Sequence, residues 1–130
     1  MSTKKDNFSL KDKKYMQIAI NLAKVRKGLT GENPSVGCLI VKNDEIISIG
    51  QTGLNGRPHA ESNAINNSVQ NLSGSKMYVT LEPCNHYGKT PPCTKKIIKS
   101  GIKEVIYSMN DIDEKVKGKS FNILSKKNIK

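Results

Sequence analysis

The chain has 130 residues, about the length of one domain, and 35% of them are hydrophobic, so we expect a single domain over residues 1–130 with a modest core. Its formal net charge of +11 favours anionic partners, yet only 5% of the residues are aromatic, which does not favour a groove that stacks nucleic-acid bases. No apolar run approaches the roughly 20 residues of a membrane span, and three cysteines cannot pair completely within one chain, so a cytoplasmic protein without a membrane anchor is expected.

Hydrophobic spacing and turn residues divide the chain into alternating helices and strands. Residues 1–8 are polar and expected to be loose, after which Ser9 with Asp12 forms a capping-box pattern that begins a helix. Gly28 is a typical stop for that helix. In chain order, the pattern predicts helix, strand, strand, helix, strand, helix, strand and helix over residues 9–27, 36–41, 45–50, 59–69, 76–81, 93–100, 104–109 and 120–127. This alternation predicts a layered α/β fold.

Histidine, glutamate and cysteine occur at points where a strand or loop leads into a helix. His59 and Glu61 are separated by one residue, and Cys84 and Cys93 follow the strand expected over 76–81. One imidazole and two thiolates suit Zn²⁺ and leave its fourth tetrahedral position to water, the open arrangement of a catalytic site. Glu61 would take a proton from the activated water and pass it to a ring nitrogen and to the leaving amine.

Two other residues compete for a role as zinc ligand. His86 would complete a closed site with four protein ligands, in which zinc serves only as a staple for the fold. Cys38 is a weaker candidate because it lies in an apolar strand, where an unliganded cysteine behaves as a small hydrophobic residue, so we expect it in the core. A zinc-stapled nucleic-acid-binding module without catalysis is a hypothesis of a different class, and such a module would not need Glu61.

The metal-ligand pattern lies within a longer stretch of characteristic sequence. His59-Ala60-Glu61, followed by Pro83-Cys84 and a further cysteine, resembles the signature of the cytidine deaminase-like superfamily. Residues 80–93, TLEPCNHYGKTPPC, are closely similar to the deaminase domain of the riboflavin-biosynthesis deaminase/reductase, and the similarity extends upstream to 33–37 and downstream to Asp111. The resemblance implies a three-layer α/β/α sandwich with a central mixed sheet.

The resemblance also implies an activity and a pocket. The reaction would be hydrolytic deamination at C2 of 2,5-diamino-6-(5-phospho-ribosylamino)pyrimidin-4(3H)-one, which gives the aminouracil phosphate and ammonia on the way to riboflavin. The implied pocket residues are Asn33, His86, Lys89, Thr90 and Asp111. Lys89 with Thr90 suits a phosphorylated ribose, whereas Asn33 is equally explained by turn chemistry before a proline. Because members of the superfamily commonly form dimers or tetramers, a homo-oligomer is expected.

The chain departs from that family at three places. Many members carry histidine seven residues before the zinc histidine, where this chain has Thr52, so one polar substrate contact is expected to change. The family's Asp-Pro-Asn-Pro run reads Asp-Ile-Asp-Glu over 111–114, without either proline. The bifunctional members continue into a reductase, and we expect no reductase domain within residues 1–130. Either a separate chain supplies the reductase, as a partner, or the sequence is part of a longer protein.

A tRNA adenosine deaminase, or another nucleic-acid deaminase, is the second enzyme hypothesis. It shares the zinc chemistry and suits the charge of +11. The long insert between the two cysteines, residues 85–92, argues against it. The substrate we predict is therefore a small phosphorylated pyrimidine and not nucleic acid.

Overall fold

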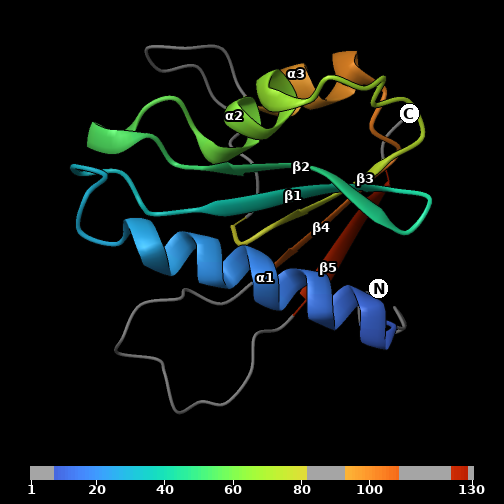
Figure 1. Ribbon diagram of the computed structural model, residues 1–130, viewed down its shortest axis with the longest axis horizontal. Helices are drawn as coiled ribbons and strands as arrows, with labels where there is room; N and C mark the ends of the chain where they lie inside the picture. The colour runs from blue at the N-terminus through green and yellow to red at the C-terminus, as the bar shows by residue number, and fades with distance from the viewer. Residues whose placement is uncertain (1–7, 82–92, 109–123, 129–130) are drawn as a thin grey trace.

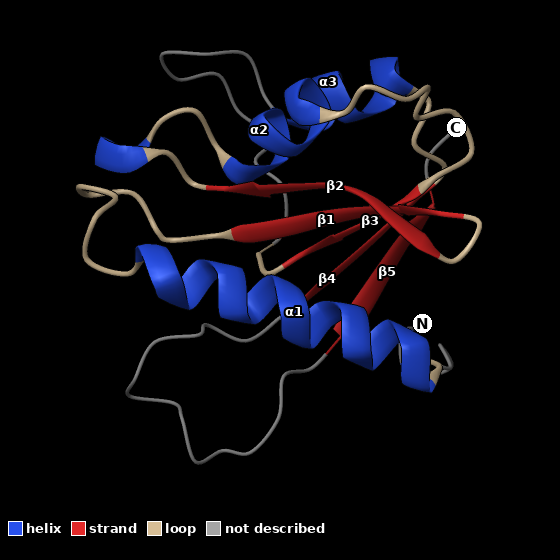
Figure 2. Ribbon diagram, in the orientation of Figure 1, coloured by secondary structure: helices blue, strands red, loops and turns tan. Residues whose placement is uncertain are grey.

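A computed structural model of the chain describes residues 8–81, 93–108 and 124–128. The elements in this part of the chain are α1 (Leu10–Arg26), β1 (Gly37–Lys42), β2 (Glu45–Gln51), the 3-10 turn η2 (Leu54–Gly56), α2 (Ala60–Asn67), β3 (Lys76–Val79), α3 (Cys93–Ser100), β4 (Glu104–Ser108) and β5 (Leu124–Asn128). Figures 1 and 2 show α1 on one face of the sheet and α2 with α3 on the other. The described chain thus forms three layers.

The sheet is mixed, and its strand order is β2-β1-β3-β4-β5. β1 pairs antiparallel with β2 and β3, β3 pairs parallel with β4, and β4 pairs antiparallel with β5. The parallel pair is connected through α3, as parallel neighbours require a crossover segment. The layers and the mixed sheet confirm the α/β/α fold class predicted from the sequence.

The two faces of the sheet bury separate cores. β1 contributes to both because successive side chains on a strand point to opposite faces. The core under α1 contains Met16, Ala19, Ile20, Leu39, Val41, Tyr78 and Ile106. The core under α2 and α3 includes Cys38, Ile40, Ala60, Ala64, Met77, Val79, Ile97 and Val105. Cys38 is fully buried, as predicted.

Local signals in the sequence correspond to the observed ends of elements. Ser9 Oγ accepts a hydrogen bond from the backbone N–H of Asp12 at 3.0 Å, and Asp12 Oδ2 accepts from the N–H of Ser9 at 3.1 Å. Gly28 has a φ of 88° just after α1 ends. Asn43 and Asp44 have φ values of 54° and 64° in the turn between β1 and β2. These residues are the types that tolerate left-handed backbone, so capping and turn chemistry set these boundaries.

The last element differs from the prediction. The sequence predicts a helix over 120–127, but Leu124–Asn128 form β5, which runs antiparallel to β4. Residues 120–123 lie outside the described residues. Intrinsic helix propensity is a weak preference, and pairing with the available edge of β4 overrides it. The predicted helix is therefore wrong over 124–127. Among the described residues, no helix is long and apolar enough to cross a membrane.

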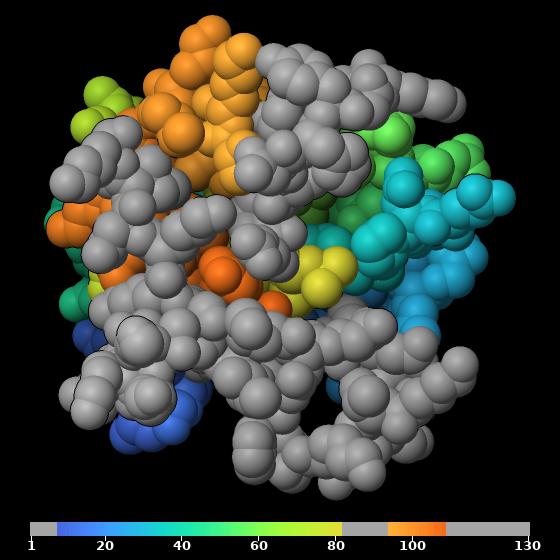
Figure 3. All heavy atoms as spheres, turned by 180° about the vertical axis from the view of Figure 1, so that it is seen from behind, coloured from blue at the N-terminus to red at the C-terminus, as the bar shows by residue number. Residues whose placement is uncertain are grey.

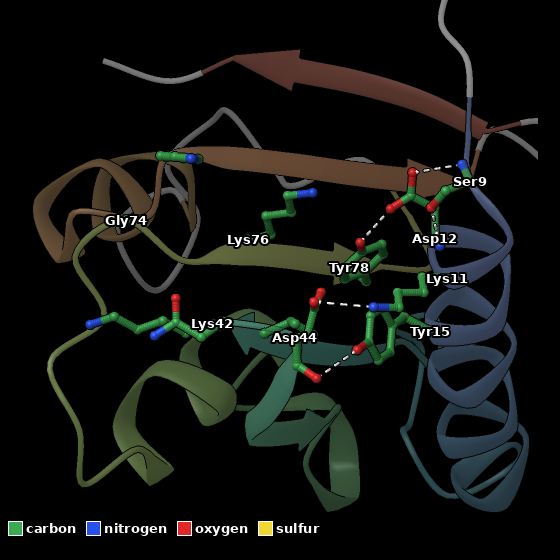
Figure 4. Close-up of a pocket in the computed structure, with 12 residues that line it drawn as sticks. Ser9, Lys11, Asp12, Tyr15, Lys42, Asp44, Gly74, Lys76 and Tyr78 are labelled. Atoms are coloured by element: carbon green, nitrogen blue, oxygen red, sulfur yellow. Dashed lines mark hydrogen bonds and ion pairs between the residues drawn. The ribbon is translucent and has the colours of Figure 1, made fainter.

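A cavity of about 250 Å³ lies between the start of α1, the β1–β2 turn and the start of β3 (Figure 4). Three of its lysines have partners. Lys11 Nζ lies 3.1 Å from a carboxylate oxygen of Asp44, Lys76 Nζ lies 3.8 Å from Glu104, and Lys42 Nζ donates to a backbone carbonyl at 2.9 Å. Since these contacts tie the surrounding elements to one another, we interpret the cavity as part of the packing.

Tyr78 forms a buried link between β3 and α1 beside this cavity. Its hydroxyl donates to Asp12 Oδ1 at 2.5 Å, and only 1% of Tyr78 and 6% of Asp12 are exposed. Figure 4 marks this hydrogen bond by a dashed line. Burial, reinforced by this hydrogen bond to Asp12, raises the pKa of Tyr78 above its ordinary value. Tyr78→Phe should lower the free energy of unfolding by about 1–3 kcal/mol, because a buried carboxylate oxygen loses its donor.

Urea unfolding of Tyr78→Phe measures this loss. Tyr15→Phe is the matched control, since the Tyr15 hydroxyl donates to the backbone oxygen of Asp44 in an exposed place. Its removal should cost less than about 1 kcal/mol because water replaces the bond. Equal urea midpoints for the two variants would contradict a special role for the Tyr78–Asp12 bond.

Candidate active site

His59 and Glu61 lie at the N-terminal end of α2. His59 is the N-cap residue of the helix and its side chain is half-buried, while Glu61 is the second helical residue and only 5% exposed. Ionisable side chains are rarely this buried without compensation. The partial positive charge of the helix N-terminus stabilises a carboxylate and supplies part of that compensation. The position of Glu61 thus suits a carboxylate that works as a base.

The position of α2 depends on its close approach to β2. A Cβ atom at Gly50 would lie 2.4 Å from the backbone oxygen of Ala60 and 2.5 Å from the backbone nitrogen of Ala64, so the helix sits where only glycine leaves room. Ser48 Oγ also donates to the Ala64 backbone oxygen at 2.5 Å. β2 therefore sets the distance of α2 from the sheet. It thereby also positions the two candidate residues, His59 and Glu61, at the start of α2.

Hydrogen bonds from α1 and the following loop hold the segment that leads to His59. Arg26 Nη1 donates to the backbone oxygen of Thr52 at 3.0 Å, and Asn33 Nδ2 donates to the backbone oxygen of Gly56 at 3.0 Å. The side-chain nitrogen of Asn33 thus bonds to the loop before His59, a long-range contact and not the local turn bond considered from the sequence. A contact between Asn33 and substrate stays a prediction.

Thr52 has a structural place in this segment. It is 1% exposed, and its Oγ1 accepts a hydrogen bond from the backbone N–H of Val36 at 2.8 Å and donates to the backbone oxygen of Pro34 at 3.1 Å. Its hydroxyl joins the end of β2 to the segment before β1. Thr52 thus has a packing role in addition to the changed substrate contact expected from the sequence.

The C-terminal end of β3 lies beside the start of β1. The backbone N–H of Thr80 donates to the backbone oxygen of Gly37 at 3.1 Å, and the N–H of Gly37 donates to Thr80 Oγ1 at 3.2 Å. In Figure 3, yellow atoms from the end of β3 lie between the orange part that contains α3 and β4 and the cyan part that leads into β1. The predicted ligand Cys84 follows this point of the chain.

Cys93 is the first residue of α3, which packs against α2 on the same face of the sheet (Figure 1). His59 and Cys93 thus mark the starts of two neighbouring helices, and thiolates are favoured at helix N-termini. The remaining predicted site residues lie outside the described residues: Cys84, His86, Lys89, Thr90 and Asp111. Within the described part, no three His, Cys, Asp or Glu side chains group as a metal site. The full ligand set stays a prediction, and its donor types fit zinc.

Comparison with known proteins identifies the family. The model of the cytidine and deoxycytidylate deaminase zinc-binding region matches residues 9–109. The chain belongs to this deaminase family. The diaminohydroxyphosphoribosylamino-pyrimidine deaminase of Buchnera aphidicola subsp. Schizaphis graminum is 50% identical over 120 residues, which are 92% of this chain and 82% of that relative. The riboflavin biosynthesis protein RibD of Aquifex aeolicus is 47% identical over 108 residues, 83% of this chain and 30% of that protein.

Solved structures agree with this membership. The deaminase superposes with a TM-score of 0.71 on the crystal structure of a diaminohydroxyphosphoribosylaminopyrimidine deaminase/5-amino-6-(5-phosphoribosylamino)uracil reductase from Thermotoga maritima. The two are 44% identical, and the match covers 75% of this chain and 29% of that chain. The deaminase therefore spans most of the Buchnera relative and less than a third of the Aquifex and Thermotoga proteins. The predicted cytidine deaminase-like fold is confirmed.

Some residues that support the candidate site gave no signal in the sequence. Arg26 stands in the last turn of a helix, where a basic residue is ordinary, and Asn63 is one of several polar residues in α2. Both donate to backbone oxygens around the loop before His59. Such long-range side-chain bonds to backbone leave no spacing pattern along the chain, so only the folded structure identifies them.

Proposed function

We propose that this deaminase converts the diaminopyrimidine ribosyl phosphate of riboflavin biosynthesis into the corresponding aminouracil phosphate and ammonia. One observation carries the proposal: a half-buried histidine and a buried glutamate begin α2 in a chain that is 50% identical, over 92% of its length, to a protein named for this activity. The Thermotoga structure, named for the same deaminase joined to a reductase, supports it. We place the enzyme in the cytoplasm, whose reducing conditions keep cysteine thiols available as metal ligands.

We assign the zinc ligands to His59, Cys84 and Cys93. One imidazole and two thiolates form a suitable set, and the start of a helix at His59 and at Cys93 supports their placement. When bound there, zinc supplies Lewis-acid activation of a water molecule. In this set His59 would contribute an imidazole nitrogen.

Glu61 moves the protons in the proposed reaction. Its carboxylate accepts a proton from the attacking water as the water oxygen bonds to C2 of the pyrimidine. The same carboxyl group then delivers that proton to the adjacent ring nitrogen. It next carries the remaining proton of the new C2 hydroxyl to the amino group, so that C2=O forms, the bond from C2 to the amino nitrogen breaks and ammonia leaves. At 5% exposure, Glu61 is largely shielded from bulk water, and this keeps its proton transfers directed to the substrate.

The substrate would be held by five residues in this proposal. They are Asn33, His86, Lys89, Thr90 and Asp111. Lys89 and Thr90 provide a cation with a neighbouring hydroxyl for the phosphorylated ribose. The net charge of +11 increases the local concentration of such an anionic substrate.

Ammonia release by the zinc-loaded protein tests the substrate assignment. The diaminopyrimidine ribosyl phosphate should be turned over with a kcat/KM at least about a hundredfold above that for deoxycytidylate or for a tRNA anticodon stem with adenosine, because specificity rests on differential binding of the transition state. Turnover of the RNA alone would overturn the proposal in favour of a nucleic-acid deaminase. Turnover of deoxycytidylate alone would assign the site to a nucleotide substrate instead.

A further inference from the structure

We propose that Asn63 is a positioning residue for the zinc histidine, a role that rests on the proposed assignment of His59 as a ligand. Asn63 lies one helical turn after His59, on α2. Its Nδ2 donates to the backbone oxygen of Gln51 at 2.7 Å and to the backbone oxygen of Pro58 at 3.3 Å. A single amide group thus joins the end of β2, the peptide immediately before His59 and the helix that carries Glu61.

Asn63 contacts the backbone on both sides of His59. The side-chain amide holds the carbonyl of Pro58, and the backbone N–H of Asn63 donates to the carbonyl of His59 at 3.0 Å. An amide nitrogen carries two hydrogens, so it can serve the oxygens of Gln51 and Pro58 at the same time. Because the two carbonyls flank the Cα of His59, these bonds restrict the direction in which its imidazole leaves the chain.

The other hydrogen bonds of the loop before His59 have a different structural effect. The backbone N–H of Gly53 donates to the same Pro58 oxygen at 2.9 Å, which closes the loop on itself, and Arg26 fastens Thr52 to α1. Asn63 instead fastens the loop to α2. Asn63 therefore fixes the position of His59, the proposed metal ligand, relative to Glu61, which lies two residues after His59 in α2. Partners that orient a ligating histidine tune metal affinity as well as geometry, and Asn63 would do so through the backbone on either side of His59.

The chain contains a matched control for this role. Asn67 lies one turn further along α2, and its Nδ2 donates to the backbone oxygen of Ile49 in β2 at 3.2 Å. The two residues share their type, their helix and the strand that they contact. They differ in the second bond, from Asn63 to the peptide before His59. A comparison of Asn63→Ala with Asn67→Ala therefore separates helix anchoring from positioning of the ligand.

Zinc dissociation constants, measured by competition with a chromophoric chelator, test the inference on the full chain. Asn63→Ala should bind zinc about tenfold more weakly than the unchanged protein, whereas Asn67→Ala should stay within about twofold. Urea midpoints measured in parallel should fall further for Asn63→Ala, which loses two bonds, one of them part-buried, than for Asn67→Ala, whose single bond is exposed. If Asn63→Ala does not fold, Asn63→Ser, which keeps one donor, is compared with Asn67→Ser in the same way.

This experiment distinguishes a failure of the positioning role of Asn63 from a failure of the proposed substrate. Equal zinc dissociation constants for the Asn63 and Asn67 variants would overturn the positioning role even if the pyrimidine is turned over. A selective loss of zinc affinity in the Asn63 variant would support the positioning role even if the pyrimidine is not turned over, and the substrate assignment would then fail alone.

Discussion

Glu61→Gln is expected to lower kcat by about a thousandfold, because the carboxamide keeps the shape of the side chain but cannot accept or return a proton. The residue is 5% exposed and stands at the second position of α2, so an isosteric replacement should leave the helix and the proposed zinc site in place. Ammonia release at saturating substrate measures kcat. Zinc content, determined on the same sample, shows whether the metal is retained.

Glu45→Gln is the control for the loss of a carboxylate. Glu45 begins β2 and is exposed, so its replacement should leave kcat within about twofold, as for most surface changes. A kcat for Glu61→Gln within about threefold of the unchanged enzyme, with zinc bound, would remove Glu61 from the mechanism.

Gly50→Ala is expected to lower the free energy of unfolding by about 3 kcal/mol, since the added methyl group has no room. Its Cβ would lie 2.4 Å from the backbone oxygen of Ala60 and 2.5 Å from the backbone nitrogen of Ala64. These are backbone atoms in the first turns of α2, so relief requires the whole helix to shift away from β2. Urea unfolding measures the loss, and zinc affinity should fall with it because His59 moves with the helix.

Gly74→Ala serves as the comparison. A Cβ at Gly74 would meet nothing within 4 Å, although its φ of 79° disfavours a side chain. This substitution should cost only about 1 kcal/mol, the cost of placing alanine in the left-handed region. Equal losses for the two variants would show that α2 does not depend on contact at Gly50.

Much of the fold could be predicted because the signals are local. The capping box of Ser9 and Asp12 begins α1, and α3 spans 93–100 as the hydrophobic spacing predicts. The burial of Cys38 follows from its place in an apolar strand. The identity of β5 could not be predicted in this way, because pairing with β4 decides it and the sequence of 124–128 alone does not.

The residues of the candidate site also fall into two groups, those with a local sequence signal and those that depend on tertiary packing. His59 and Glu61 could be named as candidates because catalytic zinc chemistry needs particular residue types at short spacing. The roles of Gly50 and Asn63 could not, since they depend on how closely α2 approaches β2. Both residues are ordinary choices in a strand end and a polar helix, and their importance arises only from tertiary packing.

The most direct test of the account is to incubate the zinc-loaded enzyme with the diaminopyrimidine ribosyl phosphate in water labelled with heavy oxygen, and to analyse the product by mass spectrometry. The account predicts replacement of one amino group by one labelled oxygen, together with one equivalent of ammonia. An unchanged substrate, with zinc fully bound and the protein folded, would contradict it.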